Sequence, residues 1–177
     1  MLTWLKDNDA EVRKAGVFNL CWLPSTGAVP NLLDAIHSES DPEVRAQMLV
    51  ALAQTGDNRG LETLLAAARE PHDTVTSAEI VRGLGRIRDP RALTTLANIV
   101  SGLAWVANGD GPLQDSKAPA GSLNVLSDAV NAFGYISQAY KAHAPDRFCG
   151  SSAIYPAQLR LDIARIEQWR KSQASKP

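Results

Sequence analysis

Residues 41–56 read DPEVRAQMLVALAQTG, and this stretch begins and ends as a single amphipathic helix does. Asp41 can accept hydrogen bonds from the free N–H groups of the first turn, and Pro42 suits the first helical position because the N–H there has no partner. Apolar residues follow at positions 44, 48, 49 and 52, which is helical spacing. Gly56 suits the end of the helix, since glycine adopts the left-handed conformation at little cost.

The same pattern occurs three times at a spacing of 32 residues, because Asp41 follows Asp9 by 32 positions and Asp73 follows Asp41 by 32. The aligned segments are 9–40, 41–72 and 73–104. Apolar positions coincide along both halves of each segment: 17, 49 and 81; 20, 52 and 84; 29, 61 and 93; 32, 64 and 96. Self-similarity with a period of about 20 to 50 residues is typical of repeat architectures.

Each segment predicts two helices. Asp57 begins the second helix of the middle segment, whose apolar positions are 61, 64, 65 and 68. A fourth unit is out of register: residues 127–136 resemble 77–87 only if an inserted loop rich in Gly, Pro, Asp and Ser, at 105–121, lies between them. We therefore expect three units with a partial N-terminal stub in 1–104, the inserted loop at 105–121, a divergent fourth helix pair within 122–171 (helices over about 122–142 and 156–171) that caps the C-terminal end, and a tail at 172–177.

Composition and charge narrow the class of protein. The chain has 177 residues, a net charge of -1 and 45% hydrophobic residues, which is ordinary for a folded domain. Proteins that bind the phosphate backbone usually carry a basic excess, so nucleic-acid binding is disfavoured. No apolar run approaches the roughly 20 residues of a membrane span, and the apolar part of the N-terminus is too short for a signal peptide. The two cysteines, Cys21 and Cys149, form no disulfide framework, and we expect a cytoplasmic protein.

Paired helices of this length, with Asp-Pro-Glu-Val-Arg at 41–45 opening the first, resemble HEAT repeats in the short bacterial form also found in phycobilisome lyase subunits. The resemblance covers residues 1–104 well and 122–171 loosely. It implies an all-α fold, a right-handed α-solenoid (an α-α superhelix) of about four helix pairs. It also implies that aspartate and arginine help to link neighbouring repeats at Asp9/Arg13 and at Asp41/Arg45, whereas the third unit has Ser77 in place of the arginine.

The resemblance implies a non-catalytic scaffold or adaptor that binds another protein or a peptide. The inner surface formed by the second helices is the expected contact region, together with the loop at 105–121. Its residues are small and mostly neutral, which suits a peptide or helix better than catalysis, because catalysis needs positioned acids, bases or nucleophiles. They are Asn31, Asp34, Thr63, Ala66, Ala67, Thr95 and Asn98.

Two further surfaces are notable because the three repeats carry different residues there. Phe18 and Trp22 are four residues apart and share one face of the first helix, an open N-terminal face. The stub folding over this face, a second subunit forming a homodimer, and additional upstream repeats would each explain it. The other surface is an arginine cluster that could bind a carboxylate or phosphate, although a solvated face partly paired with Glu79 and Asp89 is favoured. The cluster comprises Arg82, Arg86, Arg88 and Arg91.

The pattern of reactive residues predicts no catalytic residue, no metal site and no cofactor. His37, His72 and His143 are scattered without metal-binding spacing, and Cys149 is interpreted as an incidental thiol. Two alternatives stay open. One is an accessory or lyase-like subunit that binds a bilin-type ligand, as the resemblance suggests, and the other, less favoured, is a HEAT-like nucleic-acid-binding protein.

Overall fold

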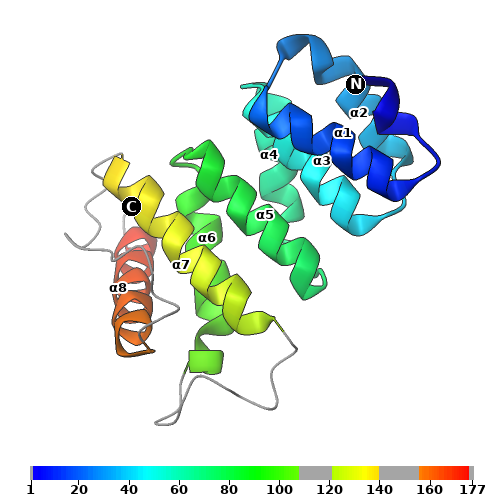
Figure 1. Ribbon diagram of the computed structural model, residues 1–177. Coiled ribbons are helices and arrows are strands. Elements are labelled where there is room, and N and C mark those ends of the chain that lie inside the picture. The colour runs from blue at the N-terminus through cyan, green and yellow to red at the C-terminus, as the bar shows by residue number, and fades with distance from the viewer. Residues whose placement is uncertain (1, 108–120, 140–155, 176–177) are drawn as a thin grey trace. The chain divides into compact units, whose positions relative to one another are not determined.

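The computed structural model describes residues 2–107, 121–139 and 156–175, and these residues form helices and no strand, so the predicted all-α class is confirmed. The chain divides into two compact units, residues 1–83 and 84–177, and the boundary falls within one helix (Figure 1). The first unit contains η1 (Leu2–Lys6), α1 (Ala10–Trp22), η2 (Thr26–Ala28), α2 (Val29–Ser38), α3 (Pro42–Gln54), α4 (Asn58–Ala67) and most of α5 (Thr74–Ile87).

Helix α3, which carries the repeat pattern most clearly, is the centre of the first unit. It packs against α1, α2 and α4, and its Val50 side chain lies against Gly83 of α5. Every residue from Met48 to Ala53 is buried. The predicted apolar stripe is therefore buried, and the flanking positions are buried as well, because a helix with neighbours on several sides needs an apolar surface nearly all round.

The predicted helix starts are formed as the sequence indicates. The Asp41 carboxylate accepts hydrogen bonds from the Glu43 and Val44 N–H groups at 2.9 and 3.1 Å. Asp9, Asp57 and Asp73 cap α1, α4 and α5 in the same way. Gly56 follows α3 with a φ of 81°, the left-handed conformation expected there.

The turn between α3 and α4 brings two backbones close together at Gly60. A Cβ atom at this position would lie 2.6 Å from the Ala53 nitrogen and 2.7 Å from the Leu52 carbonyl carbon. Backbone atoms cannot move aside as a flexible side chain can, so this approach requires glycine. The contact fixes α4 against the end of α3.

The second unit contains α6 (Ala92–Leu103), η3 (Ala104–Ala107), α7 (Ser122–Ala139) and α8 (Pro156–Ala174). Helix α6 packs against both α7 and α8. The buried Phe133 ring of α7 meets Trp169 of α8 edge to face, with 5.0 Å between ring centroids. Arg160 donates a hydrogen bond to the Ala107 carbonyl at 2.7 Å, which ties α8 to η3. These helices form a core of their own.

The fourth helix pair expected from the sequence corresponds to α7 and α8. Helix α8 runs to Ala174, beyond the predicted end at 171, and the hydroxyls of Ser172 and Ser175 bond to carbonyl groups of the preceding turn. Residues 105–107 of the expected insertion lie in η3. Residues 108–120 lie outside the described residues, and so do His143 and Cys149.

Candidate functional site

A groove of about 370 Å³ opens on the first unit. Its walls come from the turn between α2 and α3, from α3, from α4 and from the beginning of α5. Leu49 and Ile80 lie at its base and are almost fully buried, whereas the residues on its rim are exposed. The full lining is Glu39, Ser40, Pro42, Arg45, Ala46, Leu49, Thr63, Ala66, Ala67, Glu70, His72, Thr76 and Ile80.

The groove brings together three residues of the predicted inner surface: Thr63, Ala66 and Ala67, all on α4. Thr63 and Ala66 are exposed, and Ala67 is half-buried. Their small side chains leave room for the backbone of a bound segment to approach α4. The sequence predicted this wall of the groove but not the opposite wall, which Arg45 and the turn before α3 supply.

The other four predicted residues do not line the groove. Asn31 and Asp34 lie on α2, where the exposed Asp34 carboxylate pairs with Lys6. Asn98 is exposed on α6 in the second unit. The prediction for Thr95 needs correction: it was expected on the inner contact surface, but only 4% of it is exposed. Helix α6 packs against α7, α8 and η3, so its buried face is wide enough to include Thr95.

The rim of the groove carries three titratable side chains that the sequence did not single out as a group. Arg45 of α3 is exposed, and its side chain forms no hydrogen bond or ion pair with any residue that the structure describes. Glu70 is exposed beyond the end of α4. The Nε2 atom of His72 lies 2.8 Å from the Ala67 carbonyl oxygen, and it donates this hydrogen bond because a carbonyl oxygen can only accept.

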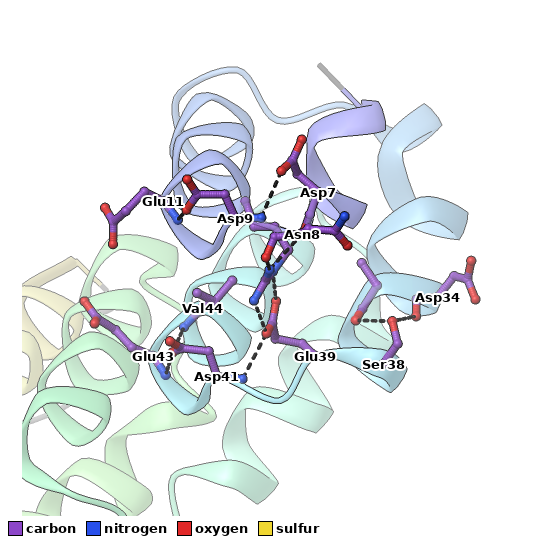
Figure 2. A network of polar contacts seen from close by, with 12 residues as sticks. Asp7, Asn8, Asp9, Glu11, Asp34, Ser38, Glu39, Asp41, Glu43 and Val44 are labelled. Atoms are coloured by element: carbon purple, nitrogen blue, oxygen red, sulfur yellow. Dashed lines mark hydrogen bonds and ion pairs between the residues drawn. The ribbon is translucent and has the colours of Figure 1, made fainter.

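Glu39 also lines the groove, but its carboxylate is already occupied. Arg13 of α1 donates two parallel hydrogen bonds to it, Nε to Oε2 at 2.7 Å and Nη2 to Oε1 at 2.9 Å. The Nη1 atom of Arg13 bonds to the carbonyls of Asp7 and Asn8. The Asp41 N–H donates to Glu39 at 2.9 Å, and Figure 2 shows the carboxylate at the centre of these contacts. The exposed fractions of the Arg13 and Glu39 side chains are only 15% and 2%.

This network keeps both partners charged. Burial raises the pKa of Glu39, but the hydrogen bonds from Arg13 and from the Asp41 backbone outweigh it, so the pKa lies below its ordinary value. The hydrogen bond to Glu39 raises the pKa of Arg13. The resemblance had implied a linking role for aspartate and arginine. In the structure Arg13 does link α1 to the turn before α3, but its carboxylate partner is Glu39, while Asp9 and Asp41 cap their own helices.

The N-terminal face remains exposed in the first unit. Phe18 and Trp22 are 62% and 67% exposed, and their rings meet edge to face with centroids 6.0 Å apart. The stub does pack on α1, where Leu5 is buried and a Cβ atom at Gly16 would lie 3.0 Å from the Trp4 Cβ. It does not cover the two aromatic rings, so stub packing does not explain them.

The four arginines of the predicted cluster have separate surroundings. Arg82 pairs with Glu79 at 3.3 Å and Arg91 with Asp89 at 2.9 Å, as the sequence favoured. The Arg88 guanidinium lies 6.0 Å from the centroid of the Tyr135 ring. Arg86 is exposed, four residues after Arg82 on α5. Internal pairing therefore uses much of the positive charge that an anion would need.

The described residues contain neither a metal-binding cluster nor a membrane-spanning helix. No group of three or more His, Cys, Asp and Glu side chains in this part of the chain could hold a metal ion. No described helix is both long enough and apolar enough to cross a bilayer.

Successive antiparallel helix pairs with a 32-residue register define an α-solenoid repeat protein. The family model for HEAT repeats matches residues 1–82, and the model for the PBS lyase HEAT-like repeat matches residues 78–102. Residues 1–102 therefore carry HEAT-like repeats, and the predicted resemblance and the predicted solenoid fold are confirmed. HEAT repeats generally mediate protein interactions. No curated protein and no solved structure matches the chain.

Proposed function

We propose that the protein is a non-catalytic scaffold or adaptor that binds a segment of another protein in the groove between α3 and α4. One observation carries this proposal: the exposed residues that the sequence assigns to the inner surface, Thr63 and Ala66, line a groove of about 370 Å³. This volume lies within the range of protein clefts that bind ligands, about 300 to 1,000 Å³. The apolar base at Leu49 and Ile80 suits an apolar side chain of the partner.

A capture experiment with matched variants tests the proposal. The double variant Ala66→Glu/Ala67→Glu places two charged side chains in the groove, and Ala15→Glu places one on the exposed surface of α1, away from it. The wild type and the Ala15→Glu variant are expected to retain the same proteins from a lysate of the native host, and the double variant is expected to lose them. Circular dichroism checks that all three are folded. Equal retention by the double variant would rule out the groove.

We further propose that Phe18 and Trp22 form a second contact surface, where another copy of the chain binds. The supporting observation is that two large aromatic rings are adjacent and mostly exposed, together with Leu23, which is 70% exposed. Multi-angle light scattering over a range of concentrations is expected to show a dimer for the wild type and a monomer for Trp22→Glu. A wild type that stays monomeric throughout would refute this contact.

A bilin-binding accessory role is the alternative, supported by the match to the PBS lyase HEAT-like repeat at residues 78–102. Binding in a folded site changes the absorption spectrum of a linear tetrapyrrole, because the site restrains its conformation. Titration of the protein with a bilin, followed by absorbance, tests this role. An unchanged spectrum would count against it.

A further inference from the structure

The equivalent arginines of the first and second repeats have different surroundings. Arg13 and Arg45 are equivalent, 32 residues apart, and each lies in the first helix of its repeat. Arg13 is held by Glu39, which lies 26 residues later in the turn before the next repeat. The position 26 residues after Arg45 is Pro71, which has no carboxylate. The repeat therefore positions a second arginine and omits the partner that would neutralise it.

The charges near Arg45 do not replace that partner. Asp41, one helical turn earlier, uses its carboxylate to cap α3. The Glu39 carboxylate is held by Arg13 and the Asp41 N–H. Glu70 shares the rim of the groove with Arg45, yet the two form no ion pair within the described part of the chain. Arg45 therefore lines the groove with an exposed side chain to which no described residue is bonded.

We propose that Arg45 binds a carboxylate of the partner, the side chain of an aspartate or glutamate in a peptide segment lying in the groove. This inference rests on the proposed function, and it names the chemistry of the partner. The Arg13–Glu39 pair shows the contact that the arginine of this repeat makes when a carboxylate is present, with both oxygens bonded at 2.7 and 2.9 Å. Charge-assisted, two-pronged contacts of this kind are among the stronger polar interactions in proteins.

The groove also defines what accompanies the carboxylate. Its base is apolar at Leu49 and Ile80, and its α4 wall is formed by the small residues Thr63 and Ala66. Glu70 and His72 lie on the rim beside Arg45, so a partner with several negative charges would meet Glu70 as well. A segment with one acidic residue next to an apolar one therefore complements this surface better than a uniformly acidic one.

The test uses a phage-displayed library of random peptides, selected on the wild-type chain of 177 residues. Peptides enriched in aspartate or glutamate are expected, and the strongest binder is synthesised for isothermal titration calorimetry. Arg45→Met is expected to weaken its binding about tenfold or more, the loss of one charge-assisted contact. Arg69→Met removes another exposed arginine that does not line the groove, and is expected to leave the affinity unchanged. Replacement of the acidic residue of the peptide by its amide is expected to remove the difference between wild type and Arg45→Met.

A second variant tests the same idea from within the chain. Pro71→Glu places a carboxylate at the position equivalent to Glu39, and this internal group is expected to compete for Arg45 and weaken the binding of the acidic peptide a few-fold, less than Arg45→Met does. Peptides that are lost on Ala66→Glu but bind wild type and Arg45→Met equally would overturn the inference and leave the groove as the binding site. If no selected peptide depends on Ala66, both the inference and the proposed function fail.

Discussion

The turns that follow the first and second repeats differ in how they interact with the equivalent arginines, Arg13 and Arg45. At residues 39–41 a bidentate ion pair with 2% of the Glu39 side chain exposed joins the chain to Arg13 of α1. In the turn at residues 71–73 the position equivalent to Glu39 is Pro71, which has no carboxylate, and Arg45 is exposed at the groove. The difference shows that a repeated residue has no fixed role in this chain. What it contacts depends on whether its partner position is repeated too.

The largest expected effect on stability concerns the turn at residues 39–41, which holds Glu39. Arg13→Met leaves the Glu39 carboxylate buried without its cation, and we expect a loss of about 3 kcal/mol in the free energy of unfolding, since breaking one side of a buried pair is costly. Arg45→Met is the matched control, and a change within about 0.5 kcal/mol is expected because the side chain is exposed and pairs with no residue that the structure describes. Urea denaturation measures both. Equal losses would mean that the two arginines are not used differently.

The next effect concerns the close approach of α4 to α3. The first repeat has Ala28 at the position of Gly60, 32 residues earlier, and Ala28 is buried there. Gly60→Ala makes the second repeat like the first at this position, but its Cβ would lie 2.6 Å from the Ala53 nitrogen. We expect a cost of about 1 to 3 kcal/mol from overpacking. Thermal unfolding followed by circular dichroism measures it.

The control for this substitution is Gly102→Ala in α6. Apart from its chain neighbours and the backbone of its own helix, no atom of the described residues lies within 4 Å of a Cβ atom at that position. Alanine is the better helix former, so a neutral effect or a gain of up to about 1 kcal/mol is expected. A neutral Gly60→Ala would show that the two helix pairs of the first unit tolerate the same spacing.

The sequence predicted the helices well because helix starts depend on neighbouring residues. Asp41 contacts N–H groups two and three residues later, and Gly56 acts through its own backbone, so both can be recognised without knowledge of the fold. Burial of the apolar stripe also followed from the 32-residue period. The burial of Thr95 could not be predicted in this way, because α6 is packed by α7 and α8, two helices that lie outside the three regular repeats.

The groove was only half predicted from the sequence. Thr63, Ala66 and Ala67 could be assigned to the surface of a second helix by periodicity alone. The role of Arg45 depends on a contact that is missing, and that becomes visible only when the Arg13–Glu39 pair is known and the equivalent Pro71 is compared with it. A comparison of the repeats alone would have shown that Pro71 stands where the first repeat has Glu39. It would not have shown that Arg45 is the residue that loses its carboxylate partner.

The stability contributed by Glu39, in the turn at residues 39–41, is expected to depend on pH. The pKa of Glu39 is lowered in the folded chain by its hydrogen bonds from Arg13 and Asp41, against the effect of burial. A lowered pKa means that the stabilisation is fully present above the ordinary glutamate value, about 4.3, and is lost as pH falls through the folded value. Glu39→Gln is therefore expected to be less stable than wild type at pH 7, and the gap should narrow below about pH 4.

Urea denaturation of both proteins at several pH values checks this. Other carboxyl groups with lowered pKa values are shared by the two proteins, so their contributions cancel in the difference; they include Asp34, Asp57, Asp73, Asp89 and Glu167. A gap that is constant from pH 7 to pH 3 would show that the charge of Glu39 does not stabilise the turn.

The smallest effect on stability is expected in the turn at residues 71–73, where a substitution can supply the carboxylate that Glu39 supplies in the preceding repeat. Pro71→Glu is expected to be more stable than Pro71→Gln by about 0.2 to 1 kcal/mol, the range for an exposed ion pair, because only the glutamate can pair with Arg45. Both variants lose the rigidity of proline equally, so the comparison isolates the charge. High salt should remove the difference, as should Arg45→Met. If glutamate and glutamine at position 71 are equally stable at low salt, the carboxylate does not reach Arg45, and the two turns differ in backbone geometry as well as in sequence.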